Sequence, residues 1–172
     1  MAKKVKKAAK KPAAAKKPKA ASKKLAAKKA APEVLKDGRP GRMWWPGLSP
    51  YMAVRDGQAS IEFYARAFGF DTYGDVMRDD DGHVSHASMR LHDAAIMFGP
   101  KEGSMGLQPP PPGATDTLSL YVYVPDVDAL HARAQRGGAT VVQPPTDQFW
   151  RDRTAVYKDP DGYHWTFATH LG

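Results

Sequence analysis

The chain has 172 residues, no cysteine and a formal net charge of +8 at pH 7, a length typical of one domain or of one domain plus a tail. The absence of cysteine excludes disulfides, zinc sites with thiolate ligands and a cysteine nucleophile. No apolar run approaches the roughly 20 residues that cross a bilayer, and the N-terminus lacks the apolar core of a signal peptide. We therefore expect a cytoplasmic protein.

The positive charge is concentrated at the N-terminus. The first 30 residues hold 13 of the 26 basic residues and no acidic residue, so the rest of the chain has 13 basic against 18 acidic residues, a net charge of −5. The alkaline pI is therefore a property of the N-terminal segment alone.

Residues 1–31 are almost entirely Lys, Ala and Pro, and Val5 and Leu25 are their only larger aliphatic residues. This composition predicts a disordered tail, because it cannot bury enough apolar area to offset the entropy of ordering. The tail resembles those of linker histones and of some bacterial nucleoid-associated proteins. Counterion release predicts salt-sensitive contact with nucleic acid or another polyanion, and a merely solubilising extension is the alternative. The candidate nucleic-acid-binding residues are Lys3, Lys4, Lys6, Lys7, Lys10, Lys11, Lys16, Lys17, Lys19, Lys23, Lys24, Lys28 and Lys29.

Residues 32–48 form a connector rich in proline and glycine. Its Trp44 and Trp45 are costly to leave in water. We expect them to dock on the following domain or on a dimer partner.

The pattern of residues 49–172 predicts one folded domain. Period-two alternation predicts a strand over 51–55, an apolar stripe predicts a helix over 57–68, and Gly69 is well placed to end that helix. The stripe consists of Ile61, Tyr64, Ala65 and Phe68. The other elements predicted for this half are strands near 70–77, 83–91 and 94–99, with turns at 79–82 and 92–93.

The same order of elements returns after a proline-rich linker at 109–112. A strand over 118–124 is followed by a helix over 126–136, which ends at two glycines. The helix has Val127, Leu130 and Ala134 on its inner side. The remaining predicted elements are strands near 139–143, 153–158 and 163–169, with a turn at 159–162.

The spacing supports a duplication. Val54 and Val124, each ending the first strand of its half, are 70 residues apart, and the last-strand segments 96–98 and 165–167 are 69 apart. We expect an α+β domain of two βαβββ units, called here the first and second repeat. Together they would form a curved eight-stranded mixed sheet, a cup, with the helices on its outer face.

Six short stretches follow one another at the spacing of known family motifs: Pro50–Val54, Ile61–Tyr64, Phe68–Gly69, Val124–Leu130, Trp150–Arg153 and Asp159–Trp165. Their order resembles the vicinal-oxygen-chelate superfamily of glyoxalase, bleomycin-resistance and dioxygenase proteins, and looks closest to its PhnB-like branch. The resemblance covers about 120 residues. It implies the fold but not the reaction, since one fold supports many functions.

Metal enzymes of this superfamily take a His from the first strand and a Glu from the last strand of each repeat. The resemblance places these four positions at Ser49, Met97, Ser119 and Thr166. Hydroxyls and a thioether are poor substitutes for the imidazole and carboxylate ligands that such metals need. We therefore expect no metal and no other cofactor, with a site built elsewhere from the six histidines as the alternative.

Alternation sorts each strand into residues that face the helices and residues that face the cup. The cup-facing set is aromatic and weakly polar, which suits a planar or amphipathic organic ligand held by ring contacts and a few hydrogen bonds. The alternative is that these side chains only fill the groove. The candidate ligand-binding residues are Ser49, Tyr51, Met97, Ser119, Tyr121, Tyr123, His164 and Thr166.

Arg153 is a further candidate for the ligand site. It lies in the segment Trp150–Arg153, where PhnB-like proteins carry Trp-Gly-Asp-Arg and this chain has Arg151 in place of the glycine. Its guanidinium could bind an anionic group of a substrate. A structural ion pair between Asp152 and an arginine of this segment is the alternative interpretation.

Three functions are consistent with these features. The first is a metal-free, homodimeric binder of a small organic molecule, such as an antibiotic, with the tail as an accessory polyanion contact. The second is an enzyme of the superfamily, a lyase, isomerase or dioxygenase-like protein, although no catalytic residues can be assigned. The third is a nucleoid-associated protein in which the tail binds DNA. No contact with a membrane is expected.

Overall fold

The computed structural model describes residues 33–34, 40–41, 46–101, 106–114 and 118–172. The chain divides into two compact parts, Met1–Arg42 and Met43–Gly172. In the first part, strands β1 (Glu33–Val34) and β2 (Pro40–Gly41) form a short antiparallel ladder within the predicted connector. The predictions for the lysine tail and for the two tryptophans of the connector fall outside the described residues.

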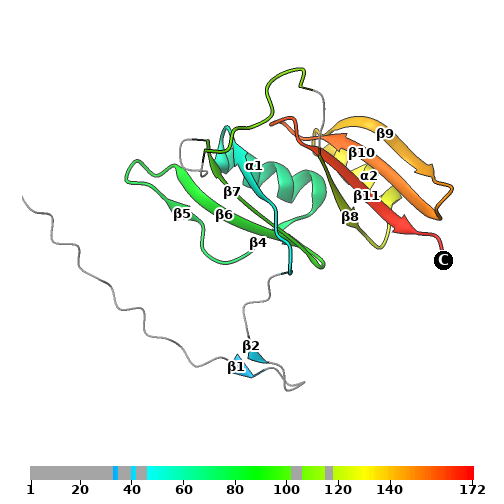
Figure 1. The fold of residues 1–172 in the computed structure, drawn as a ribbon, viewed down its shortest axis with the longest axis horizontal. Helices are drawn as coiled ribbons and strands as arrows, with labels where there is room; N and C mark the ends of the chain where they lie inside the picture. Colours follow the sequence, from blue (N-terminus) through cyan, green and yellow to red (C-terminus); the bar gives the residue numbers. More distant parts are fainter. Residues whose placement is uncertain (1–32, 35–39, 42–45, 102–105, 115–117) are drawn as a thin grey trace, which may run out of the picture. The chain divides into compact units, whose positions relative to one another are not determined.

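The first repeat follows the βαβββ order, with its second strand divided into the two short strands β4 and β5 (Figure 1). Its helix begins at Gly57 because the Asp56 carboxylate accepts a hydrogen bond from the backbone N–H of Ala59 at 3.0 Å, the usual way of capping a helix N-terminus. The strand order is β3-β7-β6-β4, with β5 paired to another stretch of β6, and only β3 and β7 run parallel. The elements are β3 (Tyr51–Val54), α1 (Gly57–Phe63), η1 (Tyr64–Phe68), β4 (Asp71–Thr72), β5 (Met77–Arg78), β6 (Val84–Leu91) and β7 (Ala94–Pro100).

The second repeat has the same plan. The Asp126 carboxylate caps its helix through the N–H of Ala129 at 2.9 Å, and the predicted inner residues of that helix are buried. The strand order is β8-β11-β10-β9, in which only β8 and β11 run parallel. The elements are β8 (Ser119–Tyr123), α2 (Val127–Arg136), β9 (Thr140–Asp147), β10 (Asp152–Lys158) and β11 (His164–His170).

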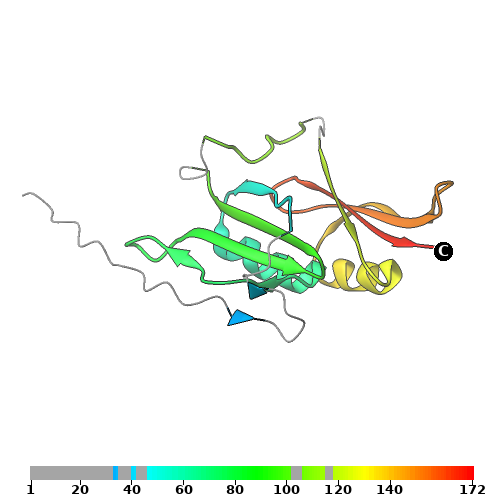
Figure 2. The same cartoon turned by 60° about the horizontal axis from the view of Figure 1, so that its bottom comes forward.

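The predicted α+β fold with two βαβββ units is confirmed. Each helix lies under the sheet of its own repeat in Figure 2. The strands of the two repeats form separate sheets, called here the first and second sheet, and no backbone ladder joins these sheets within the described residues. The single eight-stranded cup is therefore not confirmed.

The helix predicted over 57–68 is present, but its second half is a π-helix rather than an α-helix. It is an α-helix to Phe63 and then continues as the π-helix η1. The buried side chains Ser60, Phe63, Tyr64, Ala67 and Phe68 still lie three or four residues apart, so the helix keeps one buried face through the wider π turn. Phe63 and Ala67 are fully buried, whereas Ile61 and Ala65 of the predicted stripe are only partly buried.

Two predicted strands also have different lengths. The strand expected near 70–77 is two short strands, separated by a turn in which Gly74 has a φ of +76°. The strand expected near 139–143 runs on to Asp147, through Pro144 and Pro145. Prolines are tolerated there because β9 is an edge strand, which pairs only with β10 among the described strands.

An aromatic core joins the two repeats. The ring of Trp165 in β11 lies 5.4 Å, centroid to centroid, from those of Tyr64 and Phe68 in η1, and all three side chains are buried. The C-terminal end of α2 approaches η1 so closely at Gly137 that a side chain there would collide with Ala67. Close approach therefore explains the glycine at the end of α2.

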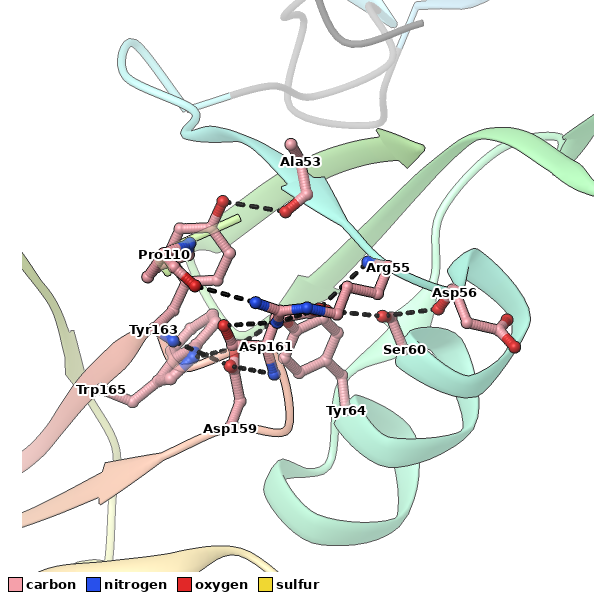
Figure 3. Close-up of polar contacts among 10 residues, drawn as sticks. All are labelled: Ala53, Arg55, Asp56, Ser60, Tyr64, Pro110, Asp159, Asp161, Tyr163 and Trp165. Atoms are coloured by element: carbon pink, nitrogen blue, oxygen red, sulfur yellow. Dashed lines mark hydrogen bonds and ion pairs between the residues drawn. The ribbon is translucent and has the colours of Figure 1, made fainter. Parts of the chain in front are cut away.

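The carboxylate of Asp159 is the buried polar centre of this interface (Figure 3). Its Oδ2 accepts hydrogen bonds from the Tyr64 hydroxyl at 2.8 Å and from the Trp165 indole N–H at 2.9 Å. Its Oδ1 accepts the backbone N–H groups of Asp161 and Tyr163, which shapes the predicted turn at 159–162. One side chain thus fixes a turn of the second repeat and binds the helix of the first.

The same turn is also fastened to strand β3. The Arg55 guanidinium and backbone N–H both donate to Asp161 Oδ1 at 3.0 Å. The Tyr163 hydroxyl donates to the carbonyl oxygen of Ala53 at 2.9 Å, and Arg55 also donates to the carbonyl oxygen of Pro110 in the linker. The Asp-Pro-Asp-Gly turn, for which the sequence suggests no catalytic role, therefore clamps the two repeats together.

Burial raises the pKa of Asp159, although the hydrogen bonds from Trp165 and Tyr64 act in the opposite direction. Burial, followed by the charge of Asp159, also raises the pKa of the Tyr64 phenol. The folded protein therefore binds a proton at Asp159 at a higher pH than the unfolded chain does, and this group adds stability as the pH falls from neutrality toward the ordinary aspartate range.

Replacing Asp159 by asparagine tests this interface. The amide can accept hydrogen bonds at one oxygen only, so we expect Asp159→Asn to lower the free energy of unfolding by about 1–3 kcal/mol although the buried charge is removed. The loss should grow as the pH is lowered from 7 toward 4, because only the wild type gains from protonation. Urea unfolding across this range measures both effects. Asp93→Asn, in an exposed turn, is the control and should change stability by less than about 0.5 kcal/mol; a loss that shrinks on acidification would contradict the raised pKa.

Candidate functional site

The face of the second sheet that points away from α2 carries most of the predicted ligand-binding residues. Along β8, Leu120 and Val122 pack toward the core, whereas Tyr121 and Tyr123 are 44% and 58% exposed on the opposite face. Neighbouring strands contribute further polar residues, because facing residues of paired strands share a face. This surface, called here the tyrosine face, consists of Ser119, Tyr121, Tyr123, Asp152, His164, Thr166 and His170.

Asp152 is the centre of the tyrosine face. It begins strand β10, and its side chain is only 3% exposed. The hydroxyls of Tyr121 and Tyr123 both donate to Asp152 Oδ2, at 2.9 and 2.8 Å. The imidazole Nδ1 of His170 lies 2.9 Å from Asp152 Oδ1. A single buried carboxylate therefore orients two phenols and one imidazole.

These contacts keep Asp152 ionised and the two phenols neutral. The hydrogen bond from His170, with further ones from the tyrosines, holds the pKa of Asp152 below its ordinary value. Burial, followed by the hydrogen bond to Asp152, raises the pKa of Tyr121 to about 12, although a bond with Trp150 acts against this rise. The pKa of Tyr123 is raised chiefly by its hydrogen bond to Asp152.

The two tyrosine rings present a wide aromatic surface. Their centroids are 5.4 Å apart and their planes are tilted by 54°. Two more aromatic residues, Phe149 and Trp150, lie in the loop between β9 and β10. Their rings pack edge to face with centroids 4.8 Å apart, and the residues are 94% and 47% exposed. Exposed aromatic side chains on a rigid sheet are suited to contact a flat apolar ligand or a partner protein.

Other predicted residues lie at the opposite end of the tyrosine face. In the parallel register, Thr166 is the partner of Tyr121 and His164 is the partner of Ser119. The hydroxyls of Ser119 and Thr166 are hydrogen-bonded to each other at 2.8 Å. Five of the predicted ligand-binding residues are therefore on β8 and β11: Ser119, Tyr121, Tyr123, His164 and Thr166.

The predicted residues of the first repeat form a separate group on the first sheet. Tyr51 and Met97 are partners in the parallel ladder of β3 and β7. The Tyr51 ring stacks on His86 with centroids 5.7 Å apart, and His86 Nε2 lies 3.2 Å from the Ser88 hydroxyl. Ser49 precedes β3, and its buried hydroxyl has no hydrogen-bond partner among the described residues.

Arg153 lies on the other face of the second sheet, away from the tyrosines. Its guanidinium donates to Asp128 of α2 at 2.8 and 3.0 Å and to Asp147 of β9 at 2.7 Å, and these two acids raise its pKa. The structure therefore does not bring Arg153 together with the other predicted ligand-binding residues. It forms an ion pair, but with these two carboxylates rather than with Asp152.

Arg151, which occupies the expected glycine position of this segment, has a φ of +70°. Positive φ is uncommon for a residue with a side chain. The backbone N–H of Arg151 donates to the carbonyl oxygen of Gln148, and its own carbonyl accepts the N–H of Leu171. The turn thus keeps a glycine-like conformation, and it holds the end of β11 that carries His170.

The four positions at which the superfamily's metal enzymes carry ligands do not fit a metal here. Ser119 and Thr166 are bonded to each other on the second sheet, whereas Ser49 and Met97 belong to the first repeat. Hydroxyls and a thioether are poor ligands for a divalent transition metal. Within the described ranges, no group of three or more His, Asp or Glu side chains is arranged to hold an ion.

Sequence reasoning did not single out Asp152 and His170 as site residues. Period-two counting from Arg153 places Asp152 on the opposite face of β10, and counting from Thr166 places His170 on the same face as that residue. The missing information was the register, which sets Asp152 directly opposite His170. Only the folded sheet shows that both tyrosine hydroxyls reach the same carboxylate.

Comparison with known proteins agrees with this fold. Residues 48–167 match the family model of the Glyoxalase/Bleomycin resistance protein/Dioxygenase superfamily. The chain is 37% identical over 127 residues to an uncharacterized protein of Mycobacterium bovis, and the match covers 72% of this chain and 82% of that protein. The identity to an uncharacterized protein of Mycobacterium tuberculosis is the same, and that match covers 74% of the relative.

Solved structures show the same architecture. The crystal structure of TioX from Micromonospora sp. ML1 superposes with a TM-score of 0.58 at 25% identity, covering 72% of this chain and 98% of that one. A glyoxalase/bleomycin resistance protein/dioxygenase family enzyme from Burkholderia phytofirmans gives a TM-score of 0.57 at 21% identity, with the same coverage. The match to the family model and the duplicated βαβββ fold together show that this chain belongs to the Glyoxalase/Bleomycin resistance protein/Dioxygenase superfamily.

Proposed function

We propose that the protein binds a small planar organic ligand on the tyrosine face, without a metal ion. The observation that carries this proposal is the pair of exposed rings of Tyr121 and Tyr123, whose hydroxyls are both held by the buried Asp152 carboxylate. Because these rings are fixed before a ligand arrives, binding costs little side-chain entropy. Ring contacts and hydrogen bonds then supply the affinity. No helix in the described part of the chain is long and apolar enough to span a membrane, and we propose a cytoplasmic location.

An enzymatic activity is the second candidate. The hydrogen-bonded pair of Asp152 and His170 supports it, since a carboxylate that orients an imidazole is a common arrangement in acid–base catalysis. Apart from the hydroxyls of Tyr121 and Tyr123, which donate to Asp152, no nucleophile is hydrogen-bonded to this pair among the described residues. Substrate turnover, rather than stable capture, would favour the enzyme.

Removal of the two rings tests ligand binding. We expect the wild type to bind 2-methoxynaphthalene, used as a neutral planar probe, equally well with and without EDTA. The double change Tyr121→Ala and Tyr123→Ala should weaken binding about tenfold or more, since each lost ring contact is worth about 0.5–1.5 kcal/mol. The matched control, Tyr121→Phe with Tyr123→Phe, keeps the rings and should retain binding. Titration calorimetry measures all three proteins; loss of binding on chelation would contradict the metal-free proposal.

We also propose that the protein is a homodimer in which a second copy covers part of this surface. Strand β8 pairs only with β11 among the described strands, so its other edge is open, and open edges are usually covered. Several large apolar residues near this edge and around the adjoining β9–β10 loop and C-terminus are exposed. They are Leu118, Tyr121, Tyr123, Phe149, Trp150 and Leu171. The first sheet of a second copy, with Tyr51 and Met97, is the surface that we propose to face them.

Sedimentation equilibrium tests the dimer. The wild type should sediment as a dimer at micromolar concentration, and Leu118→Glu, which puts a charge beside the open edge of β8, should shift it toward the monomer. The control is Gln58→Glu, an added negative charge on an exposed position of α1, which should leave the mass unchanged. A monomeric wild type at all concentrations up to about 100 μM, in the range where weak dimers associate, would contradict this proposal.

The lysine-rich segment 1–31 is proposed to contact DNA or another polyanion. Its 13 lysines and complete lack of acidic residues support this proposal, because each phosphate that is neutralised releases condensed counterions. A nucleoid-associated role would follow if this contact occurs in the cell.

Deletion of residues 1–31 tests the tail. We expect the full chain to retard double-stranded DNA of any sequence at 50 mM salt and the truncated chain to lose this activity. If six or more phosphates are contacted, affinity should fall about a thousandfold between 50 and 200 mM salt. Retardation that persists in the truncated chain would place the contact in the folded domain and contradict the proposal.

A further inference from the structure

The hydrogen bonds at Asp152 determine which polar atoms of the tyrosine face are donors. An ionised carboxylate can only accept hydrogen bonds. The hydroxyl protons of Tyr121 and Tyr123 are therefore both directed at Asp152 Oδ2, at 2.9 and 2.8 Å. Each phenolic oxygen retains lone pairs but has no proton left for a ligand.

The same reasoning assigns the tautomer of His170. Its Nδ1 lies 2.9 Å from Asp152 Oδ1, and since the carboxylate has no proton to give, the hydrogen must be on Nδ1. In a neutral imidazole, the other nitrogen, Nε2, is then an acceptor. The His170 side chain is 59% exposed, so a ligand can reach it.

The His170 end of the tyrosine face includes no lysine or arginine of the sheet to oppose the charge of Asp152. The register places Lys158 on the same face, but opposite His164 and six residues along β10 from Asp152, roughly 20 Å away. The nearest sequence candidate, Arg153, is on the opposite face and is paired with Asp128 and Asp147. Ser119 and Thr166 have two hydroxyl protons between them, and one of these forms the hydrogen bond that joins the two side chains. The other is the one hydroxyl proton of the tyrosine face that remains for a ligand. Thr166 and His170 are four positions apart on β11, roughly 13 Å along the strand, so that proton is at the other end.

We infer that the His170 end of the tyrosine face selects a planar ring that carries a hydrogen-bond donor, a hydroxyl or N–H group, which His170 Nε2 accepts. This inference rests on the proposed ligand binding and defines the class of ligand. Asp152 acts as a positioning residue, because it fixes the tautomer that makes Nε2 an acceptor. A ring whose substituent can only accept hydrogen bonds gains none from His170 Nε2 or from the two phenols, and an anionic substituent is repelled by Asp152.

The test compares two probes that differ by one methyl group, 2-naphthol and 2-methoxynaphthalene. Titration calorimetry on the full chain, at a pH where imidazole and naphthol are both neutral, should give an affinity about five- to tenfold higher for 2-naphthol, the worth of one hydrogen bond. In His170→Ala the affinity for 2-naphthol should fall to the level of the affinity for 2-methoxynaphthalene. The affinity for 2-methoxynaphthalene should be the same in the variant and in the wild type.

A spectroscopic readout separates this role from a structural one. Long-range ¹H–¹⁵N correlation spectra of the wild type should show the Nδ1–H tautomer of His170, and the Nε2 resonance should move on addition of 2-naphthol but not of 2-methoxynaphthalene. Asp152→Asn should abolish the preference for 2-naphthol, since an amide can donate to Nδ1 and reverse the tautomer.

The outcomes that overturn the inference are distinct from those that overturn ligand binding. Equal affinities of the wild type for the two probes, an Nε2–H tautomer, or a preference that survives in His170→Ala would each overturn the donor-selective role of His170 while ligand binding stands. If neither probe binds the wild type, the proposed function itself fails.

Discussion

The buried carboxylate of Asp159 is the interaction on which the rest of the domain depends. It bonds to the π-helix of the first repeat, to the indole of β11 and to its own turn at the same time. Burying an ionised group is costly unless its hydrogen-bonding capacity is satisfied, and here four donors surround it. Together with the Arg55–Asp161 and Tyr163–Ala53 contacts, this carboxylate restricts how the two repeats meet beside aromatic rings that could otherwise pack in several ways.

Strand β10 has an important carboxylate at each end, Asp152 at its first position and Asp159 directly after its last. The two are seven residues apart, an odd number, so they point to opposite faces of the sheet. Asp159 faces the helices and holds the fold together, whereas Asp152 faces outward and organises two tyrosines and a histidine. A single strand thereby links the rigid core to the exposed site. A site built on such a strand is held more accurately than one built on a loop.

The sequence was informative about architecture because that information is local. Helix caps at Asp56 and Asp126, turn residues, alternation along strands and the repeat spacing are all read within short windows, and the helices and most strands lie where these signals predict. The π-helix was not predictable, since an apolar stripe gives no sign of a wider turn. The choice of Phe63 and Ala67 over Ile61 and Ala65 as core residues was not predictable either, because both sets have helical spacing. Nor was the division into two sheets, which depends on how the repeats pack rather than on the pattern within either.

The candidate site was predictable in part for the same reason. Alternation correctly placed Tyr121, Tyr123 and Thr166 on one face, and the exposure of the two tyrosines follows from it. The roles of Asp152 and His170 depend on cross-strand register, and the true partners of Arg153 come from α2 and β9, which are distant in sequence or separated by a turn. Neighbouring residues such as Asp152 and Arg153 look like an ion pair in the sequence, but in a strand they necessarily point apart.

The left-handed conformation of Arg151 has a consequence for how this family member can change over time. The carbonyl oxygen of Arg151 accepts the backbone N–H of Leu171, the residue after His170. The position of His170 therefore depends on the β9–β10 loop, which is distant from it in the sequence. Insertions and deletions usually accumulate in such hairpin loops. Here a change of one residue would pull the C-terminal strand end with it and separate His170 from Asp152, which makes this loop's length as constrained as that of a core strand.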